Sequence, residues 1–237
     1  MDDLQTVIRN LAAGNRILAN EGIVDAMGHI SARHPHNPRR YLLSWARSPG
    51  LVEPEDIMEF ELDGTPVKDD GRPIYIERPI HGSIYEARPE VMSVVHNHCH
   101  DVLPFAITRT PMRPAVHNAR RIGDEVPVWE IRDKFGDTDM LVTTMEQGRD
   151  LVSVLKDNKA TLMRGHGCAV TGTTISDAVQ TSISLKVNAC AILAAMTLGE
   201  ICYLTPGEIR AKQAGAASLK GFDRAWEYLC RRAGMTP

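Results

Sequence analysis

The sequence predicts a single α/β domain in which helices cover both faces of a mainly antiparallel or mixed central sheet. Segments with the apolar spacing of helices alternate along the chain with short apolar segments typical of strands. The 237 residues, of which 43% are hydrophobic, suffice for one sizeable core. Because no internal repeat, low-complexity segment or linker divides the chain, we expect one domain over residues 1–237.

The first third of the chain is predicted to hold one helix and several short strands. Residues 4–23 space apolar side chains at helical intervals, and Gly22 is placed to end this helix. Residues 28–35 and 41–50 have the composition of strands joined by a proline-rich turn. Residues 57–67 carry a further strand into an Asp-Gly hairpin signal. This part of the chain is therefore predicted to be rich in β-structure.

Helices and strands alternate through the rest of the chain. The predicted segments are a helix at 78–88, a buried strand at 91–100, a helix at 146–158, two strands around a glycine-flanked turn at 160–172, and a long apolar helix at 175–198. Two more helices, divided near Gly221, are expected to form a C-terminal extension over residues 206–237.

Composition argues against several classes of protein. The net charge is only -3 and no dense run of Lys and Arg is present, so we expect no nucleic-acid partner. No run approaches the roughly 20 apolar residues that cross a bilayer, and the first ten residues lack a secretory leader. We therefore expect a cytoplasmic protein without a membrane partner. The five cysteines never form a C-x-x-C pair, which argues against a disulfide framework or a four-cysteine zinc site.

Three histidines alternate at the end of the predicted strand at 91–100. His96 and His98 would share one strand face, and His166, between two glycines, could supply a third ligand from elsewhere. Three imidazoles with an open position suit a catalytic site for a divalent metal, and Glu77 is a candidate carboxylate partner. The spacing permits such a site without establishing it, because isolated histidines are usually hydrogen-bonded surface or core residues. We assign that ordinary role to His34, His36 and His100.

Two segments carry a family resemblance. "ERPIHGSIYEARPEVMSVVHNHCH" resembles the class II aldolase/adducin signature, in which a Glu opens a short helix and a strand ends in a His-x-His pair. "KATLMRGHGCAVTGTTISDAV" is similar to the second block of that family, in which a glycine-flanked His precedes a long helix. The similarity extends from the opening helix to about residue 205.

The resemblance implies a three-layer α/β/α sandwich with one divalent metal ion per subunit, either Zn, Mn, Fe or Co. It implies that His96, His98 and His166 bind this ion and that Glu77 lies beside it, as a ligand or as an acid/base. It also implies a homotetramer with active sites at the subunit interfaces. His81, one turn after Glu77, is expected to be structural and to orient Glu77 or cap the turn.

The chain departs from the sugar-phosphate aldolases of this family at the places where they hold phosphate. His29 stands in the "GHIS" turn where those enzymes carry Asn, the second turn lies within "SWARSPGL", and Tyr75-Ile76 replaces a pair of serines. Because small hydroxyl and amide donors are lost, we do not expect a phosphorylated substrate.

The replacements favour a carboxylate substrate. Arg47 and Arg78 each offer a planar fork that can hold a carboxylate, and Ser44 begins the same turn as Arg47. The alternatives are a surface or intersubunit salt bridge for Arg47 and a position facing the neighbouring subunit for Arg78. His29 and His117 could add hydrogen-bond donors or a proton.

This pattern resembles the family branch of metal-dependent decarboxylases of hydroxylated ring diacids, such as the dihydroxyphthalate and hydroxymethylpyridine-dicarboxylate decarboxylases. We therefore predict a carboxy-lyase of aromatic compound catabolism that acts on a small hydroxylated aromatic or heteroaromatic dicarboxylate through a metal-stabilised enolate. Glu77, His29 and His117 are the candidates for proton delivery.

Two other functions stay open. One is an aldolase or epimerase of a non-phosphorylated hydroxy-keto acid, and the other is a non-enzymatic, adducin-like interaction module. Trp226 and Tyr228 could cover a flat substrate from a neighbouring subunit, or simply pack the terminal helix on the core.

Overall fold

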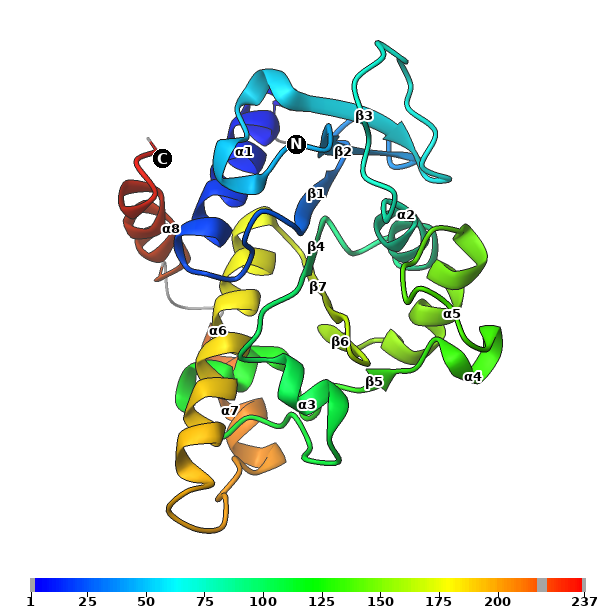
Figure 1. Cartoon of the computed structure of the whole chain (residues 1–237). Helices are drawn as coiled ribbons and strands as arrows, with labels where there is room; N and C mark the ends of the chain where they lie inside the picture. Colours follow the sequence, from blue (N-terminus) through cyan, green and yellow to red (C-terminus); the bar gives the residue numbers. More distant parts are fainter. Residues whose placement is uncertain (1–2, 217–220, 236–237) are drawn as a thin grey trace.

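The computed structural model describes residues 3–216 and 221–235 (Figure 1). The elements in chain order are α1 (Leu4–Asn20), β1 (His29–Arg33), β2 (Arg40–Ser44), the 3-10 helices η1 (Pro49–Leu51) and η2 (Pro54–Asp56), β3 (Ile57–Glu61), α2 (Pro79–Ala87), β4 (Ser93–Asn97), α3 (Leu103–Ile107), the 3-10 helix η3 (His117–Ile122), β5 (Val128–Trp129), α4 (Arg132–Phe135), α5 (Met145–Leu155), β6 (Ala160–Met163), β7 (Gly167–Gly172), α6 (Ile175–Ala195), α7 (Pro206–Ala216) and α8 (Gly221–Arg232).

One mixed sheet forms the middle layer of the molecule. Its seven strands run in the order β3-β2-β1-β4-β7-β6-β5. All neighbouring pairs are antiparallel except β5 and β6, which are parallel. The predicted α/β fold with a mainly antiparallel or mixed sheet is confirmed.

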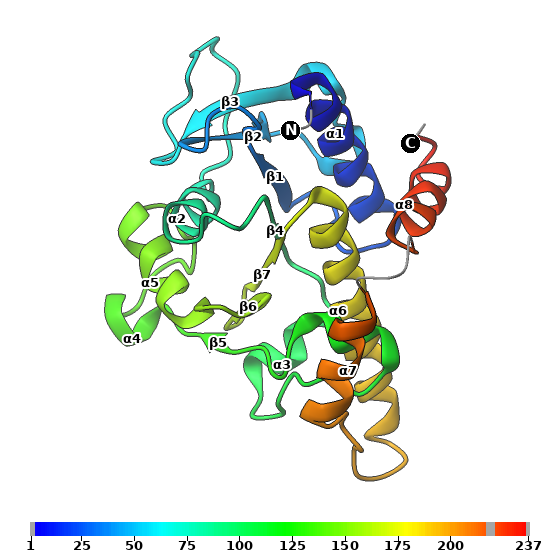
Figure 2. The ribbon, with the colours of Figure 1, turned by 180° about the vertical axis from the view of Figure 1, so that it is seen from behind.

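Helices cover both faces of this sheet. In Figures 1 and 2, α1 and α6 lie on one side of the strands and α2 and α5 on the other. Each face has its own apolar core, and β4 contributes to both, since Val95 belongs to the core under α1 and α6 and Val94 to the core under α2 and α5. A strand buried on both faces has no polar alternation, which explains the continuous apolar run before His96.

Strand β1 also has two buried faces, but they differ in polarity. Ile30 and Ala32 point into the core that α1 and α6 cover. Because side chains alternate along a strand, His29, Ser31 and Arg33 point to the opposite face, towards α2, and all three are buried. The sheet therefore carries a row of polar side chains beneath α2.

Close contacts at two glycines fix the position of α2. A Cβ atom at Gly82 would lie 1.9 Å from the carbonyl oxygen of Leu62. A Cβ atom at Gly148, on α5, would lie 2.3 Å from Ser83 Oγ and 2.8 Å from the carbonyl oxygen of Pro79. Helices α2 and α5 thus touch through a surface with no room for a methyl group.

Helix α6 corrects one expectation from the sequence. By length and composition alone it is apolar enough to cross a membrane, although we expected no such segment. Half of its most apolar window is buried inside the protein, against α1, β4, β7 and η3. A core helix passes the same test, so this is weak evidence for a membrane span.

The segment between residues 101 and 144 contains elements that the sequence analysis did not foresee, namely α3, η3, β5 and α4. At the C-terminal end of the chain, α8 packs on α1 (Figure 2). Trp226 is partly buried against the core, whereas Tyr228 is 61% exposed. All five cysteines are free thiols, and Cys99, Cys168 and Cys230 are buried.

Candidate metal centre

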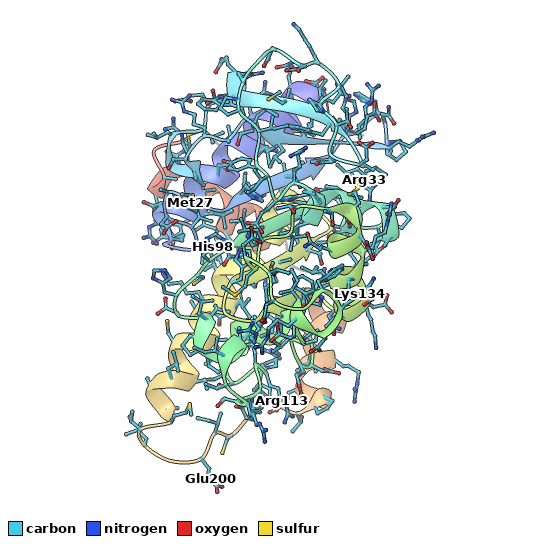
Figure 3. All side chains as sticks on the ribbon, turned by 45° about the vertical axis from the view of Figure 1, so that its right-hand side comes forward. Met27, Arg33, His98, Arg113, Lys134 and Glu200 are labelled. Carbon is cyan, nitrogen blue, oxygen red and sulfur yellow. The ribbon has the colours of Figure 1, made fainter. Side chains whose placement is uncertain are left out.

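Three separate segments bring the predicted metal ligands together. His96 lies near the end of β4 and His98 just beyond it, because the strand ends at Asn97. His166 lies in the tight turn between β6 and β7, and Glu77 lies just before α2. Figure 3 shows His98 near the middle of the molecule, where the blue strands meet the green helices. Sheet pairing of β4 with β7 brings the two histidine segments side by side.

Glu77, His96, His98 and His166 form what we call the candidate metal cluster. One ligand atom from each residue lies within 4.8 Å of all the others. His98 Nε2 is 3.0 Å from His96 Nε2 and 3.1 Å from His166 Nε2. Glu77 Oε2 is 3.3 Å from His96 Nε2 and 3.4 Å from His166 Nε2. Three imidazole nitrogens and one carboxylate oxygen that converge on a point form a donor set suited to Zn, Mn, Fe or Co.

Backbone groups orient three of these four side chains. His166 Nδ1 lies 2.9 Å from the carbonyl oxygen of Met140, and His96 Nδ1 lies 3.2 Å from that of Cys168. A carbonyl can only accept, so each Nδ1 carries a proton and each Nε2 is left facing the cluster, as the atom whose lone pair would bind a cation. The N–H of Val142 donates to Glu77 Oε1 at 3.0 Å, which leaves Oε2 facing the histidines. The donor set is therefore arranged for a cation before one binds.

Met140 is held in an unusual backbone conformation. Its φ of 67° lies in the left-handed region, which costs a non-glycine residue about 1 kcal/mol or more. The hydroxyl of Thr138 accepts a hydrogen bond from the Met140 N–H at 3.0 Å. This conformation turns the Met140 carbonyl towards His166, so local strain accompanies the orientation of a cluster residue.

Electrostatics favours the protonation states that a cation needs. Burial raises the pKa of Glu77, but His96 and His166 outweigh it and hold the pKa well below its usual range. Burial, together with His96 and His166, lowers the pKa of His98 to about 4. At neutral pH the cluster thus contains a carboxylate and an unprotonated His98, the forms that bind metal.

His29 lies beside the cluster and pairs with His96 across the sheet. Its ring centroid is 5.2 Å from that of His96 and 4.4 Å from that of Tyr75. Burial, with the neighbouring His81 and His96, lowers the pKa of His29 well below its ordinary value. His29 is therefore a neutral imidazole between the cluster and Tyr75.

The structure corrects the expectation for His81. Its Nε2 lies 2.6 Å from His29 Nδ1, and its Nδ1 lies 2.6 Å from Ser31 Oγ. Both nitrogens are thus engaged away from Glu77, so His81 orients His29 instead. Burial is the main cause that lowers the pKa of His81 to about 3.

Residues 44–56, which we call the arginine turn, are linked to His29 through Tyr75. Arg47 Nη1 donates to Asp56 Oδ2 at 2.6 Å, and Trp45 Nε1 donates to Asp56 Oδ1 at 2.7 Å. Tyr75, whose ring is tilted by 46° against that of His29, donates from its hydroxyl to the carbonyl oxygen of Arg47. Ser44 is buried at the end of β2. The turn therefore touches the surroundings of the cluster, with its arginine in an ion pair within the chain.

Arg78 and His117 occupy other positions. Arg78 donates from Nε to the carbonyl oxygen of Gly64 at 2.6 Å and from Nη1 to that of Tyr75 at 3.0 Å, so it ties the β3 hairpin to the start of α2. His117 is exposed at the start of η3, which packs on α6 and α7. In the single chain neither belongs to the candidate metal cluster.

The remaining histidines match the ordinary role predicted for them. His34 Nδ1 accepts hydrogen bonds from the backbone N–H groups of His36 and Asn37 in a turn. His100 is exposed beyond the end of β4.

Several residues around the cluster were not found from the sequence. Met140 and Val142 act through backbone atoms, so their side chains carry no signal. Ser31 and Tyr85 become visible only when strand alternation is applied to β1 and helical spacing to α2, because His29 and Ser31 are two residues apart and His81 and Tyr85 are four apart.

Comparisons with known proteins agree with this geometry. Residues 9–193 match the family described as Class II Aldolase and Adducin N-terminal domain. The chain is 34% identical to Decarboxylase tropJ of Talaromyces stipitatus over 204 residues, which cover 81% of this chain and 77% of that protein. It is 28% identical to a 3,4-dihydroxyphthalate decarboxylase of Arthrobacter keyseri over 237 residues, which cover 94% of this chain and 92% of that protein.

Solved structures show the same fold. An aldolase II superfamily protein from Pseudomonas syringae superposes with a TM-score of 0.81 at 21% identity, over 98% of this chain and 94% of that one. L-fuculose 1-phosphate aldolase from Glaciozyma antarctica superposes with a TM-score of 0.75 at 23% identity, over 98% of this chain and 93% of that one.

Proposed function

The chain belongs to the class II aldolase and adducin family, and we propose that it is a divalent-metal-dependent decarboxylase of a small hydroxylated aromatic or heteroaromatic dicarboxylate. That it is an enzyme, a carboxy-lyase, follows from the relatives named decarboxylases. The observation that carries the metal-dependent mechanism is the convergence of Glu77, His96, His98 and His166 on one point, with His29 beside it. A dihydroxyphthalate-like diacid is the proposed substrate class.

The cluster supports the bond-breaking step. A divalent cation held by these four side chains would act as a Lewis acid for the negative charge that develops on a substrate oxygen. Protonation of the ring carbon that bears the carboxylate would convert the neighbouring phenolate to its keto form. The electron pair of the breaking carbon–carbon bond can then pass through the ring to the keto oxygen, which becomes a phenolate again as carbon dioxide leaves. Both oxygens of Glu77 are engaged, one with the Val142 N–H and one with the histidines, so we assign Glu77 to the ligand set.

The ring carbon that loses the carboxylate must therefore receive a proton. Neither Glu77 nor His29 holds a spare one at neutral pH, because the pKa of each is well below its ordinary value. We propose that water is the proton source and that His29 holds this water beside the substrate. The proton passes to the carbon, and hydroxide and carbon dioxide are the other products. His117 stays a proposed proton carrier only for a site completed by a neighbouring subunit.

The arginine turn supports recognition of a second carboxylate. The ion pair with Asp56 uses Arg47 Nη1, and the Arg47 side chain is 33% exposed. Asp56 thus holds the Arg47 guanidinium in place. The other N–H groups of this guanidinium are available to bind the carboxylate that the substrate keeps. Ser44 is proposed to contribute from the same turn, and Arg78 to act by fixing the loop before α2.

We extend the proposal to a homotetramer with active sites at subunit interfaces, in the cytoplasm, in aromatic compound catabolism. The family resemblance supports this assembly. Light scattering on the purified protein tests it, and a monomer would contradict it.

The test of the reaction uses the purified protein loaded in turn with Zn, Mn, Fe or Co. Candidate hydroxylated aromatic diacids and non-phosphorylated hydroxy-keto acids are supplied, and carbon dioxide and aldehyde are both measured. We expect carbon dioxide from a diacid without aldehyde. Aldehyde without carbon dioxide would overturn the decarboxylase in favour of the aldolase alternative, and failure to bind any of the four metals would favour the interaction module.

A further inference from the structure

A continuous chain of hydrogen bonds runs from α2 through β1 to His29. Tyr85 Oη lies 2.8 Å from Ser31 Oγ, and Ser31 Oγ lies 2.6 Å from His81 Nδ1. His81 Nε2 lies 2.6 Å from His29 Nδ1. We call these four residues the histidine–hydroxyl chain. All four side chains are buried, so solvent does not compete for their hydrogen bonds.

The far end of this chain sets the direction of every hydrogen bond in it. The backbone N–H of Val94 interacts with the Tyr85 hydroxyl and can only donate. Tyr85 therefore gives its own proton to Ser31, and Ser31 gives its proton to His81 Nδ1. An imidazole that accepts at Nδ1 is protonated at Nε2 when neutral, so His81 donates to His29 Nδ1. By the same rule His29 carries its proton on Nε2.

The surroundings reinforce this arrangement. Arg33, the third polar residue of the same β1 face, donates to the carbonyl oxygens of Tyr85 and Arg88 at 2.9 Å each and so holds the end of α2 on the strand. The Arg33 guanidinium also lies 4.8 Å from the centre of the Tyr85 ring. Tyr85 is thereby fixed from both its backbone and its ring.

We propose that His81, Ser31 and Tyr85 are positioning residues that hold His29 as the Nε2–H tautomer. A nitrogen that carries a proton has no lone pair for a cation, so His29 is kept out of the metal ligand set although its ring lies 5.2 Å from that of His96. The same Nε2–H is a hydrogen-bond donor, and a donor stabilises an oxygen that becomes negative. These two neighbouring histidines therefore have opposite tasks, because His96 would present its Nε2 lone pair to a bound cation, whereas His29 presents a proton.

The catalytic part of this inference rests on the proposed function, because the oxygen that His29 serves would be that of the water or the substrate in decarboxylation. The tautomer itself does not depend on the reaction. It can be measured in protein that turns over no substrate.

The test is nitrogen NMR of the ¹⁵N-histidine-labelled protein, metal-free and zinc-loaded, in which long-range proton–nitrogen correlations distinguish the two neutral tautomers. We expect His29 to be protonated at Nε2 in both forms. Protonation at Nδ1 in the unaltered protein would overturn the inference without any variant. In Ser31→Ala and in Tyr85→Phe we expect a mixture of tautomers, because one link is removed from the chain.

Matched controls are available on the same sheet. Ser93 is a buried serine on β4 that donates to the carbonyl oxygen of Ser31 at 2.7 Å but lies outside the chain. Tyr41 is a buried tyrosine on β2 whose hydroxyl lies 3.4 Å from the carbonyl oxygen of Arg78. Ser93→Ala and Tyr41→Phe should leave the His29 tautomer unchanged, and Ser31→Thr, which keeps a hydroxyl, should preserve it. An equal change in the controls would mean that general loosening of the core is responsible.

Kinetics then tests the consequence for catalysis. Ser31→Ala and Tyr85→Phe should each lower kcat about tenfold, with KM within about twofold and metal content unchanged. The double variant should lose little more than either single one, since both break one chain. A change in tautomer without loss of kcat would overturn the catalytic part. Absence of decarboxylation in the unaltered protein would instead overturn the proposed function and leave the tautomer result standing.

Discussion

The candidate metal cluster and the arginine turn are both linked to His29, the cluster through His96 and the turn through Tyr75, and they satisfy their polar groups in different ways. In the cluster, backbone groups engage the outer atoms of Glu77, His96 and His166, and the inner atoms of the cluster converge on one point. In the turn, Asp56 neutralises Arg47 and accepts from Trp45. The first arrangement is incomplete without a cation, whereas the second is stable without a ligand. Unsatisfied, convergent atoms therefore indicate a binding site more strongly than a charged residue does.

Removal of one cluster ligand should have the largest effect. We expect His98→Ala to lose the bound metal and to lower turnover by a factor on the order of 10³, because charge stabilisation at the reacting oxygen is lost. Metal content by atomic spectroscopy and the rate of carbon dioxide release give the measurement. The matched control is His100→Ala, two residues further on and exposed, which should retain both. Full activity in metal-free His98→Ala would contradict the metal mechanism.

Neutralisation of the single carboxylate in the cluster should have the next largest effect. Glu77→Gln can still accept from the Val142 N–H but carries no charge. We expect metal affinity to fall about 10- to 100-fold, a range typical of altered metal sites. Titration with zinc against a competing chelator measures it. An unchanged affinity would show that Glu77 is not a ligand.

The two arginines should respond differently. If Arg47 holds the retained carboxylate of the substrate, Arg47→Ala should raise KM about tenfold with kcat within about threefold, because a hydrogen bond to a charged group contributes roughly 1.5–3 kcal/mol. Arg78→Ala should leave KM unchanged and lower thermal stability, since Arg78 contacts backbone carbonyls. If Arg47→Ala and Arg78→Ala changed KM equally, Arg47 could not be assigned to substrate binding and Arg78 to stability.

The smallest predicted effect concerns the stability of the turn. Burial raises the pKa of Asp56, but hydrogen bonds from the Glu53 N–H, Trp45 and Arg47 outweigh it, so the pKa lies below its ordinary value. A depressed pKa stabilises the fold above the unfolded value near 4 and loses that contribution as pH falls through the folded pKa. Asp56→Asn should therefore cost about 1–3 kcal/mol at pH 7 and less at pH 3.

Urea unfolding of the metal-free protein at both pH values measures this difference. The exposed Asp157 offers a control, and Asp157→Asn should change stability by no more than about 0.5 kcal/mol. A cost for Asp56→Asn that is the same at pH 3 as at pH 7 would show that the carboxylate charge is not the cause.

The sequence predicted the sheet, its flanking helices and the members of the cluster, because each depends on local patterns. Strand and helix periodicity identified β4, β7 and α6, and two characteristic blocks identified His96, His98 and His166. What it missed depends on contacts between distant segments. The Arg47–Asp56 pair requires knowledge of the fold of the turn, the role of Met140 is performed by a carbonyl group, and the partner of His81 lies 52 residues away.

The contact between α2 and α5 links the evolution of distant positions. Gly148 lies on α5, outside the cluster, yet a methyl group there would meet Ser83 and Pro79 on α2. The same helix carries His81 and Tyr85 and begins two residues after Glu77. A methyl group at position 148 would push α2 away from α5, and this shift would disturb both the cluster and the histidine–hydroxyl chain. Position 148 is therefore expected to show epistasis with residues it never touches, so that a change there alters which substitutions at the site are tolerated.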